Sequence, residues 1–407
     1  MPPCQHISRR IASPLWVWAW ALAATPALAQ EAGTETASER SHTYIGVSQA
    51  FSHDSNVYRT STNESKETIS VTGVLAGIDQ PIGRQRIYGD VAAQINRYQN
   101  NDVLNNKSYA INAGLDWQTI EFLSGTLHYS TRNSLADFGE LNGSTAASDQ
   151  ITQQFLANVR LGLTSKLSFD TSYEYRDFKY KNDLYADRNY NQHTVGGGFH
   201  WGRADQLVFG LGYRATKSRT PEFQDTPPFE DELDRRDIDF TTTWAPTGFS
   251  SINARISSTK ETHSLDSVGE RSGWTGAFSW DYKPTAKLGF VAAIVRDSGA
   301  EATFIGMAPD GTKPLRVDQS TLSTTSQLRA SYAMTSKISL NGDVHYRKGK
   351  LAGGTQETVG AYMLGITYEP LRSVLLGCNV DYENRDTSAA TAYTVTVGTC
   401  SAQFTLK

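Results

Sequence analysis

Polar and apolar residues alternate with a period of two through most of this chain, and this pattern limits the folds that it can adopt. In the run 108–118 the apolar residues are Tyr109, Ile111, Ala113, Leu115 and Trp117, and the polar residues between them are Ser108, Asn112, Asp116 and Gln118. Runs 167–176 and 338–347 alternate in the same way. Because successive side chains of a strand point to opposite faces, each run predicts a strand with one apolar and one polar face.

The runs come in pairs that repeat about every 40 residues, and each pair reads as one β-hairpin. Short connections are predicted at 79–84, 119–124, 164–166, 202–205, 246–249, 283–287, 335–337 and 369–372. Longer polar connections are predicted at 53–66, 100–107, 136–150, 181–190, 217–234, 262–271, 298–320, 349–357 and 386–391. These connections predict about eighteen strands, and the predicted number lies between sixteen and eighteen. The segments near 40–52 and 356–368 alternate least clearly.

A soluble β-sandwich would show the same alternation, so the lengths of the connections decide between the two folds. Regular exchange of short turns and longer loops is typical of outer-membrane barrels, which have short periplasmic turns and longer outer loops. No segment after the N-terminal region has the 18 or more consecutive apolar residues of a membrane-spanning helix. The chain is therefore predicted to be all-β, a transmembrane antiparallel up-and-down β-barrel.

Four tryptophans support this membrane placement. Trp117, Trp201, Trp244 and Trp280 each lie close to a predicted short turn and on the apolar face of their strand. Outer-membrane barrels carry such a girdle of aromatic residues where the wall meets the lipid headgroups. The alternative is that aromatic residues simply favour strands.

Residues 1–29 have the pattern of a cleaved secretory signal peptide. Arg9 and Arg10 precede the apolar stretch 11–24, and 27–29 reads Ala-Leu-Ala before the expected cut. An uncleaved anchor helix is the alternative, but the apolar stretch is shorter than the roughly 20 residues that a span needs. The predicted organisation is a signal peptide at 1–29, a flexible periplasmic lead-in at 30–41 and the barrel at 42–407.

The charge balance argues against a nucleic-acid partner. The chain has 38 basic and 42 acidic residues, and its net charge of −4 becomes −6 without Arg9 and Arg10. No basic patch interleaved with aromatic residues is found.

Two cysteines, Cys378 and Cys400, remain after the signal peptide. They lie on the last two predicted strands, almost symmetrically about the connection between them. We predict a disulfide that pins the closing hairpin; the alternative is two separate wall residues.

The polar faces of the strands are predicted to line the lumen of the barrel. The charged candidates are Asp90, Asp116, Arg132, Arg160, Asp170, Glu174, Arg176, Arg214, Asp239, Arg255, Asp281, Arg329, Asp343 and Arg347, to which Asp381 and Glu383 are added near the C-terminus. Both signs are present in similar numbers, so a strong preference for anions or cations is not expected. A solvated wall without a specific role is the alternative for each of them.

No motif predicts catalysis, a cofactor or a metal site. The histidines after the signal peptide, which are His42, His53, His128, His193, His200, His263 and His345, form no recognisable group with a serine and an acid. Asp54–Asn56 could contribute to a cation-binding loop but more readily caps a turn. The acidic, proline-rich outer loop 217–237 is expected to be solvated; if it folded inward, Phe223 and Phe229 could stack on sugar rings.

Several short segments resemble a known family. They are 51–59 (FSHDSNVYR), 81–86 (PIGRQR), Arg97–Tyr98, Leu115–Trp117 and Ser124–Gly125. Together they resemble the outer-membrane β-barrel proteins encoded in exopolysaccharide-biosynthesis operons of Gram-negative bacteria, also grouped as β-barrel porins. The match is close over roughly the first hundred residues after the signal peptide. One departure is the C-terminal Lys407, where many outer-membrane barrels end in an aromatic residue.

The resemblance implies a role in moving exopolysaccharide across the outer membrane, in contact with lipid and alongside periplasmic or inner-membrane export proteins. Arg84 and Arg86 in the PIGRQR segment would then lie at the periplasmic mouth and engage a partner or an acidic sugar; alternatively they stabilise a tight turn. The leading prediction is a non-catalytic, hydrated conduit for exopolysaccharide. The rivals are a general or solute-specific diffusion porin, which a fixed inward constriction loop and a trimer would favour, and a structural barrel with a closed lumen.

Overall fold

The computed structural model describes residues 43–119, 122–141, 144–162, 164, 166–203, 206–225, 228–265, 270–298, 322–350, 356–387 and 392–406. The predicted signal peptide and lead-in lie outside these residues and stay predictions.

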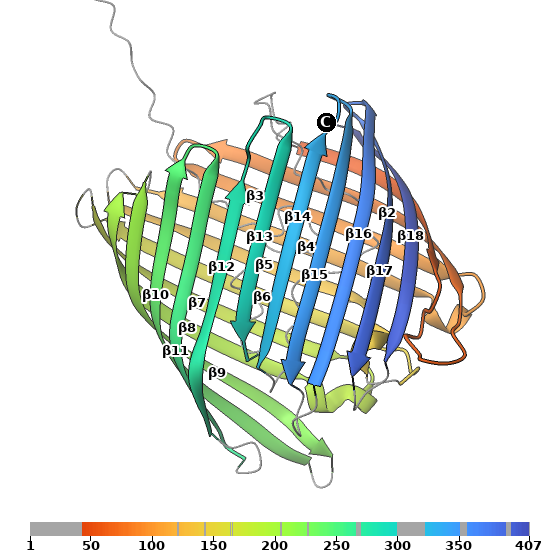
Figure 1. The fold of residues 1–407 in the computed structure, drawn as a ribbon, viewed down its shortest axis with the longest axis horizontal. Helices are drawn as coiled ribbons and strands as arrows, with labels where there is room; N and C mark the ends of the chain where they lie inside the picture. The colour runs from red at the N-terminus through yellow and green to blue at the C-terminus, as the bar shows by residue number, and fades with distance from the viewer. Residues whose placement is uncertain are drawn as a thin grey trace, which may run out of the picture.

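The described residues form one closed sheet of eighteen antiparallel strands (Figure 1). The strands are β1(Thr43–Asp54), β2(Glu67–Ile82), β3(Gln85–Tyr98), β4(Asn106–Gln118), β5(Leu123–Leu135), β6(Asp149–Gly162), β7(Leu167–Tyr180), β8(Tyr190–Arg203), β9(Leu207–Asp225), β10(Pro228–Thr247), β11(Ser250–His263), β12(Glu270–Tyr282), β13(Leu288–Asp297), β14(Ser323–Ala333), β15(Ile338–Lys350), β16(Gln356–Leu371), β17(Val374–Thr387) and β18(Tyr393–Leu406). Each strand pairs with its neighbours in the sequence, and β1 pairs with β18 from Ile45 opposite Leu406 to Asp54 opposite Val397. The prediction of an eighteen-stranded up-and-down barrel is therefore confirmed.

The predicted short turns all occur, and they lie together at the upper end of the barrel in Figure 1. In one of the tightest, Gly83 and Arg84 alone separate β2 from β3, and Gly83 has φ +63°. Only glycine adopts this left-handed conformation without strain, so the PIGRQR segment is built around its turn.

One predicted outer loop is wrong. Residues 217–234 do not form a loop, because β9 continues to Asp225 and β10 starts at Pro228. The pair projects beyond the other strands at the lower end of Figure 1 rather than folding inward. There Pro221, Glu222 and Phe223 face the single residue Glu230 across a register shift, and a bulge of this kind tolerates proline. Beyond the membrane neither face of a strand needs to be apolar. The outer parts of β9 and β10 therefore do not alternate, and the sequence pattern could not predict them as strands.

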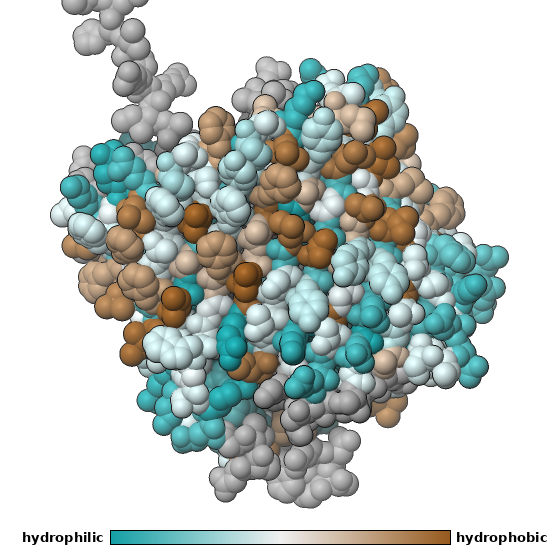
Figure 2. All heavy atoms as spheres, in the orientation of Figure 1, coloured by the Kyte–Doolittle hydropathy of each residue, from teal (hydrophilic) through white to brown (hydrophobic). Residues whose placement is uncertain are grey.

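Outward-facing side chains form an apolar belt around the barrel. Exposed Ile, Val, Leu and Phe residues alternate with buried polar ones along the strands, as Val47 and Phe51 do with Ser48 and Ser52 in β1. Figure 2 shows apolar residues gathered over the upper part of the visible wall and hydrophilic residues towards the end with the longer loops. A soluble fold would place these apolar side chains inside.

Aromatic residues border this belt at both ends. Trp201, Trp244 and Trp280 are exposed near the short turns, whereas Trp274 and Tyr346 are exposed towards the outer loops. A closed barrel with an apolar belt between two aromatic rims is the architecture of an outer-membrane β-barrel.

Helices are a minor part of the fold. The described ones are η1(Asp102–Leu104), η2(Phe138–Leu141) and η3(Asp183–Arg188), all in outer connections. None of the helices in the described part of the chain has the length and hydrophobicity that a membrane crossing requires.

Cys378 of β17 and Cys400 of β18 are direct partners in the sheet and form a disulfide, with their Cα atoms 4.1 Å apart. Both lie on the outward face of the wall. The covalent link therefore joins the last two strands of the barrel on its lipid-facing side.

Candidate functional site

The inner wall of the barrel carries the charged candidates. The strand parity opposite to the exposed apolar residues includes all fourteen of them: Asp90, Asp116, Arg132, Arg160, Asp170, Glu174, Arg176, Arg214, Asp239, Arg255, Asp281, Arg329, Asp343 and Arg347. Asp381 and Glu383 share this parity on β17. The functional role of each stays a prediction, and the contacts below show which of them the fold brings together.

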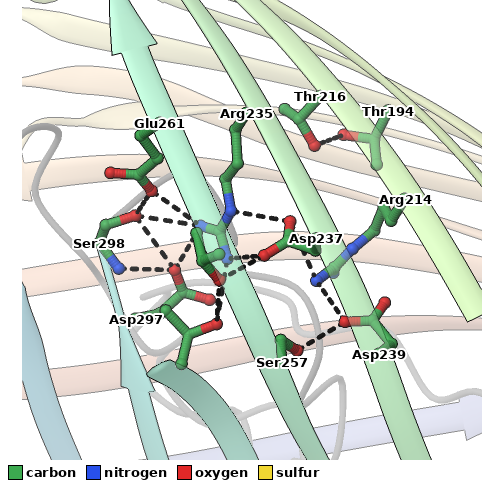
Figure 3. A network of polar contacts seen from close by, with 12 residues as sticks. Thr194, Arg214, Thr216, Arg235, Asp237, Asp239, Ser257, Glu261, Asp297 and Ser298 are labelled. Carbon is green, nitrogen blue, oxygen red and sulfur yellow. Dashed lines mark hydrogen bonds and ion pairs between the residues drawn. The ribbon is translucent and has the colours of Figure 1, made fainter. Parts of the chain in front are cut away.

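A dense ionic network lies on the inner wall between β9 and β13, and Arg235 is its centre (Figure 3). The Arg235 guanidinium donates from Nε to Asp237 Oδ2 at 2.9 Å and from Nη1 to Asp297 Oδ1 at 2.6 Å. Nη1 also lies 3.4 Å from Glu261 Oε1 and donates to Ser298 Oγ at 3.0 Å. Arg235 and Asp237 are fully buried, so this cation connects three acidic side chains from β10, β11 and β13 out of contact with bulk water.

Further arginines extend the network. Arg214 of β9 lies 3.4 Å from Asp237 and 3.3 Å from Asp239, and Arg271 of β12 donates to Glu261. Arg255 of β11 is buried and lies 3.9 Å from Asp297 Oδ2. Charges of both signs therefore compensate one another along this part of the wall.

The most buried members of this network were not among the predicted residues. Arg235 and Asp237 fell in a segment read as an outer loop, and Glu261 and Asp297 lie at the outer ends of their strands. A signal was present, because Ile238 and Phe240 are outward-facing apolar residues. Continuing their alternation backwards would have placed Asp237 and Arg235 on the inner face.

A second network lies on β14 to β17. Arg329 donates to Asp343 at 3.1 Å. Buried Glu357 lies between Arg347, at 3.0 Å, and Arg385, with which it also forms an ion pair. Glu357 and Arg385 were missed for the same reason as Asp297, since each is close to the outer end of its strand.

Several of the remaining inner-wall candidates make local contacts. These are Asp90 with Asn112, Asp116 with Thr126, Arg160 with Ser168, Glu174 with Gln154 and Arg176, Asp170 with His200, and Asp281 with Lys283. The structure therefore gathers some candidates into two networks and leaves others as neighbouring pairs.

Arg84 and Arg86 have different environments at the short-turn end. Arg84 is exposed and donates to the Thr119 carbonyl at 3.2 Å. Arg86 binds Asp79 with two hydrogen bonds of 2.7 and 2.6 Å and lies 3.7 Å from Asp116. These contacts favour a structural role in the turn over engagement of a partner.

In its described part, the outer connection 136–148 reaches inward as far as β17. Arg385 of β17, 246 residues further along the chain, donates to the carbonyl of Gly139 in η2. From the opposite direction Arg188, at the end of η3, donates to the carbonyl of Glu140. This connection joins β5 to β6, and β17 lies several strands away from them around the barrel. The contact with β17 therefore holds the connection over the interior.

Arg59, in the connection between β1 and β2, adds a third anchor. It lies 2.8 Å from Asp54 and 3.9 Å from Asp137 of the connection 136–148, which we call the inward loop. Burial would lower the pKa of Arg59, but the attraction of Asp137 and Asp54 outweighs it and raises the pKa above its ordinary value. Arg59 therefore stays a cation wherever the protein is folded.

A small apolar core holds these outer connections together. Its buried residues are Val57, Leu104, Ala136, Phe138, Leu141, Tyr180 and Tyr185, and Tyr58 packs edge-on against Phe138 with ring centroids 5.0 Å apart. These residues come from four different connections and strand ends. The outer mouth of this half of the barrel is thus a packed structure rather than a set of separate loops.

Comparisons with known proteins give structural neighbours only. Family models and curated proteins give no match. Among solved structures, OccK5 (OpdH) of Pseudomonas aeruginosa is 13% identical, with a TM-score of 0.45, over 90% of this chain and 98% of that one. OpdK of Pseudomonas aeruginosa is 11% identical, with a TM-score of 0.48, over 89% and 98%. A structure described as a bacterial polysaccharide outer membrane secretin is 9% identical, with a TM-score of 0.36, over 90% and 100%.

The DSN segment has a structural role in the outer mouth. Asp54 accepts a hydrogen bond from the backbone N–H of Asn56 at 2.8 Å, and the Asn56 amide donates to the carbonyls of Thr60 and Thr394. These contacts are those of a turn cap, and Arg59 supplies the counter-charge of Asp54. Within the described ranges no group of three or more His, Cys, Asp or Glu side chains is arranged to hold a metal ion.

Proposed function

We propose that this protein is a passive outer-membrane channel for small hydrophilic solutes, with its outer mouth narrowed by the inward loop 136–148. The observation that carries the proposal is the fixation of this loop by Arg59, Arg188 and Arg385. A loop fixed inside the mouth limits the size of what passes, whereas a long polymer needs an unobstructed path. The diffusion channel is therefore better supported than the polysaccharide conduit.

The charges of the inner wall support a channel for uncharged or zwitterionic solutes. Arg235 faces Asp237, Asp297 and Glu261, and the second network alternates arginines with acids. Opposite charges held side by side leave little net potential along the pore, yet their local fields orient polar molecules.

Single-channel conductance in planar bilayers tests the proposal. We expect stable open steps from the wild type and larger steps when residues 138–145 are replaced by a shorter Gly/Ser linker. Replacing 222–229, at the tip of the projecting β9–β10 hairpin, is the matched control and should leave the conductance unchanged. Absence of open steps from the correctly folded wild type would contradict the channel.

Export of exopolysaccharide is the second candidate function. It is supported by the resemblance of the 51–59 and 81–86 segments and by hydroxyl groups on the inner wall, such as the Thr194–Thr216 and Thr259–Thr275 pairs. Hydroxyl side chains can exchange hydrogen bonds with a sugar. Its partners would be the polysaccharide and periplasmic or inner-membrane export proteins.

Two measurements separate this candidate from the diffusion channel. Purified exopolysaccharide added to one side of the bilayer should block the open steps if the polymer enters the lumen. A strain that lacks the protein should then have less polymer outside the cell. Open steps that ignore the polymer, together with unchanged export, would leave the diffusion channel as the function.

A further inference from the structure

Two basic side chains on the outside of the barrel, Arg296 and Lys348, belong to neither ionic network. Arg296 is on β13 and Lys348 on β15, and both are exposed. In the register of the sheet Arg296 pairs with Thr324 of β14, and Thr324 pairs with Lys348. The three side chains therefore form one row across adjacent strands, and strand spacing puts the Cα atoms of the two bases about 10 Å apart.

This row lies at the outer edge of the apolar belt. The next outward-facing residues towards the short turns are Ile294, Ser326 and Tyr346, followed by Leu328 and Val344. Ile294, Leu328, Val344 and Tyr346 are all exposed on the surface of the barrel. The wall below the row is therefore suited to acyl chains, and the row itself lies at the level of the lipid headgroups.

Arg296 and Lys348 have no acidic partner among the described residues, which distinguishes them from Arg236 and Lys260, two other outward-facing bases near the outer rim. Arg236 lies 3.1 Å from Asp234, and Lys260 lies 3.4 Å from Glu270. Asp386 is the acid in the same cross-strand row, but it pairs with Thr358 and so lies two strands beyond Lys348. Within the described part of the chain, the positive charge of the row is therefore available to a ligand.

We propose that Arg296, Thr324 and Lys348 bind the phosphorylated headgroup of a membrane lipid whose acyl chains lie along the wall below. A guanidinium makes two parallel hydrogen bonds to a phosphate, an ammonium adds a compact charge, and the threonine hydroxyl donates between them. This lipid site depends only on the outer face of the barrel and is independent of the solute that passes through the lumen.

Native mass spectrometry of the protein released from mixed micelles tests the site, with phosphatidic acid as the probe and phosphatidylcholine as the neutral comparison. We expect the wild type to retain phosphatidic acid in preference to phosphatidylcholine. Since each base near a membrane surface contributes appreciably to binding of an anionic lipid, R296Q/K348Q should weaken the first phosphatidic acid Kd on the order of tenfold. Binding of phosphatidylcholine should not change.

The matched control is R236Q/K260Q, which removes two exposed bases that already have acidic partners and should keep the wild-type Kd. The proposal would be overturned if R296Q/K348Q and R236Q/K260Q lost affinity for phosphatidic acid equally, or if R296Q/K348Q kept the wild-type affinity. Inorganic phosphate at millimolar concentration should not displace the lipid, because it gains nothing from the apolar wall. Displacement would show that a free phosphate is sufficient and that no lipid site exists.

Discussion

Arg235 is the residue whose loss should be most costly for the barrel. In Arg235→Met the carboxylates of Asp237, Asp297 and Glu261 lose their shared cation in a buried setting. Breaking a buried ion pair from one side typically costs about 3–5 kcal/mol. We expect a loss of this size in the free energy of unfolding, measured by urea denaturation in lipid vesicles.

Arg236 provides the control, because it is adjacent in sequence but exposed on the outer surface. Its ion pair with Asp234 is solvated, and such pairs contribute about 0–1 kcal/mol. Arg236→Met should therefore remain close to the wild type. Equal stability of the two variants would show that the Arg235 network does not stabilise the barrel.

Residue identities on the inner wall were predictable where alternation was continuous, and their partners were not. Arg214 and Asp239 followed from the parity of their strands, but parity alone cannot say that Arg235 of β10 reaches Asp297 of β13. The contact depends on the curvature of a closed sheet, which brings inner side chains together across intervening strands. Strand ends were missed because the alternation weakens where the membrane ends.

The inward loop is the element whose position should decide the conductance. Gly139 is buried, and a Cβ atom at this position would overlap the Tyr393 hydroxyl of β18. Gly139→Val should therefore displace η2 from its contact with β18 and weaken the Arg385 anchor. We expect larger or noisier single-channel steps than those of the wild type.

Gly248→Ala is the control for this substitution, since a Cβ atom in the β10–β11 turn meets nothing within 4 Å. Its conductance and stability should match the wild type. A Gly139→Val channel with wild-type conductance would mean that the loop does not limit the open path.

The closing hairpin is a second element with a measurable role. The Cys378–Cys400 disulfide closes a loop with a sequence separation of 22 residues, for which chain entropy gives roughly 3 kcal/mol. C378S/C400S should unfold at lower urea concentration than the oxidised wild type. A reducing agent should lower the stability of the wild type to that of the variant, and no difference between oxidised and reduced protein would contradict the assignment.

Elements inside the membrane could be predicted because lipid on one side and polar lumen on the other force a local, period-two pattern. Outside the membrane that constraint ends, which is why the outer parts of β9 and β10 were read as a loop. The anchoring of 136–148 could not be predicted either, because Gly139 and Arg385 are 246 residues apart and nothing in the local pattern links them.

At the scale of the whole molecule, the balance of inner-wall charge predicts weak ion selectivity. The sixteen predicted candidates comprise seven arginines and nine acids, and the residues that the structure added, Arg235, Arg385, Asp237, Glu261, Asp297 and Glu357, also include more acids than bases. We expect the reversal potential in a KCl gradient to show a slight preference for K⁺, with a permeability ratio below about 3. Asp297→Asn should move this ratio towards one if the network lies along the conducting path, whereas exposed Asp234→Asn on the outer surface should not. A strongly anion-selective wild type would mean that the paired arginines are not neutralised as their contacts indicate, and the preference for uncharged or zwitterionic solutes would then be wrong.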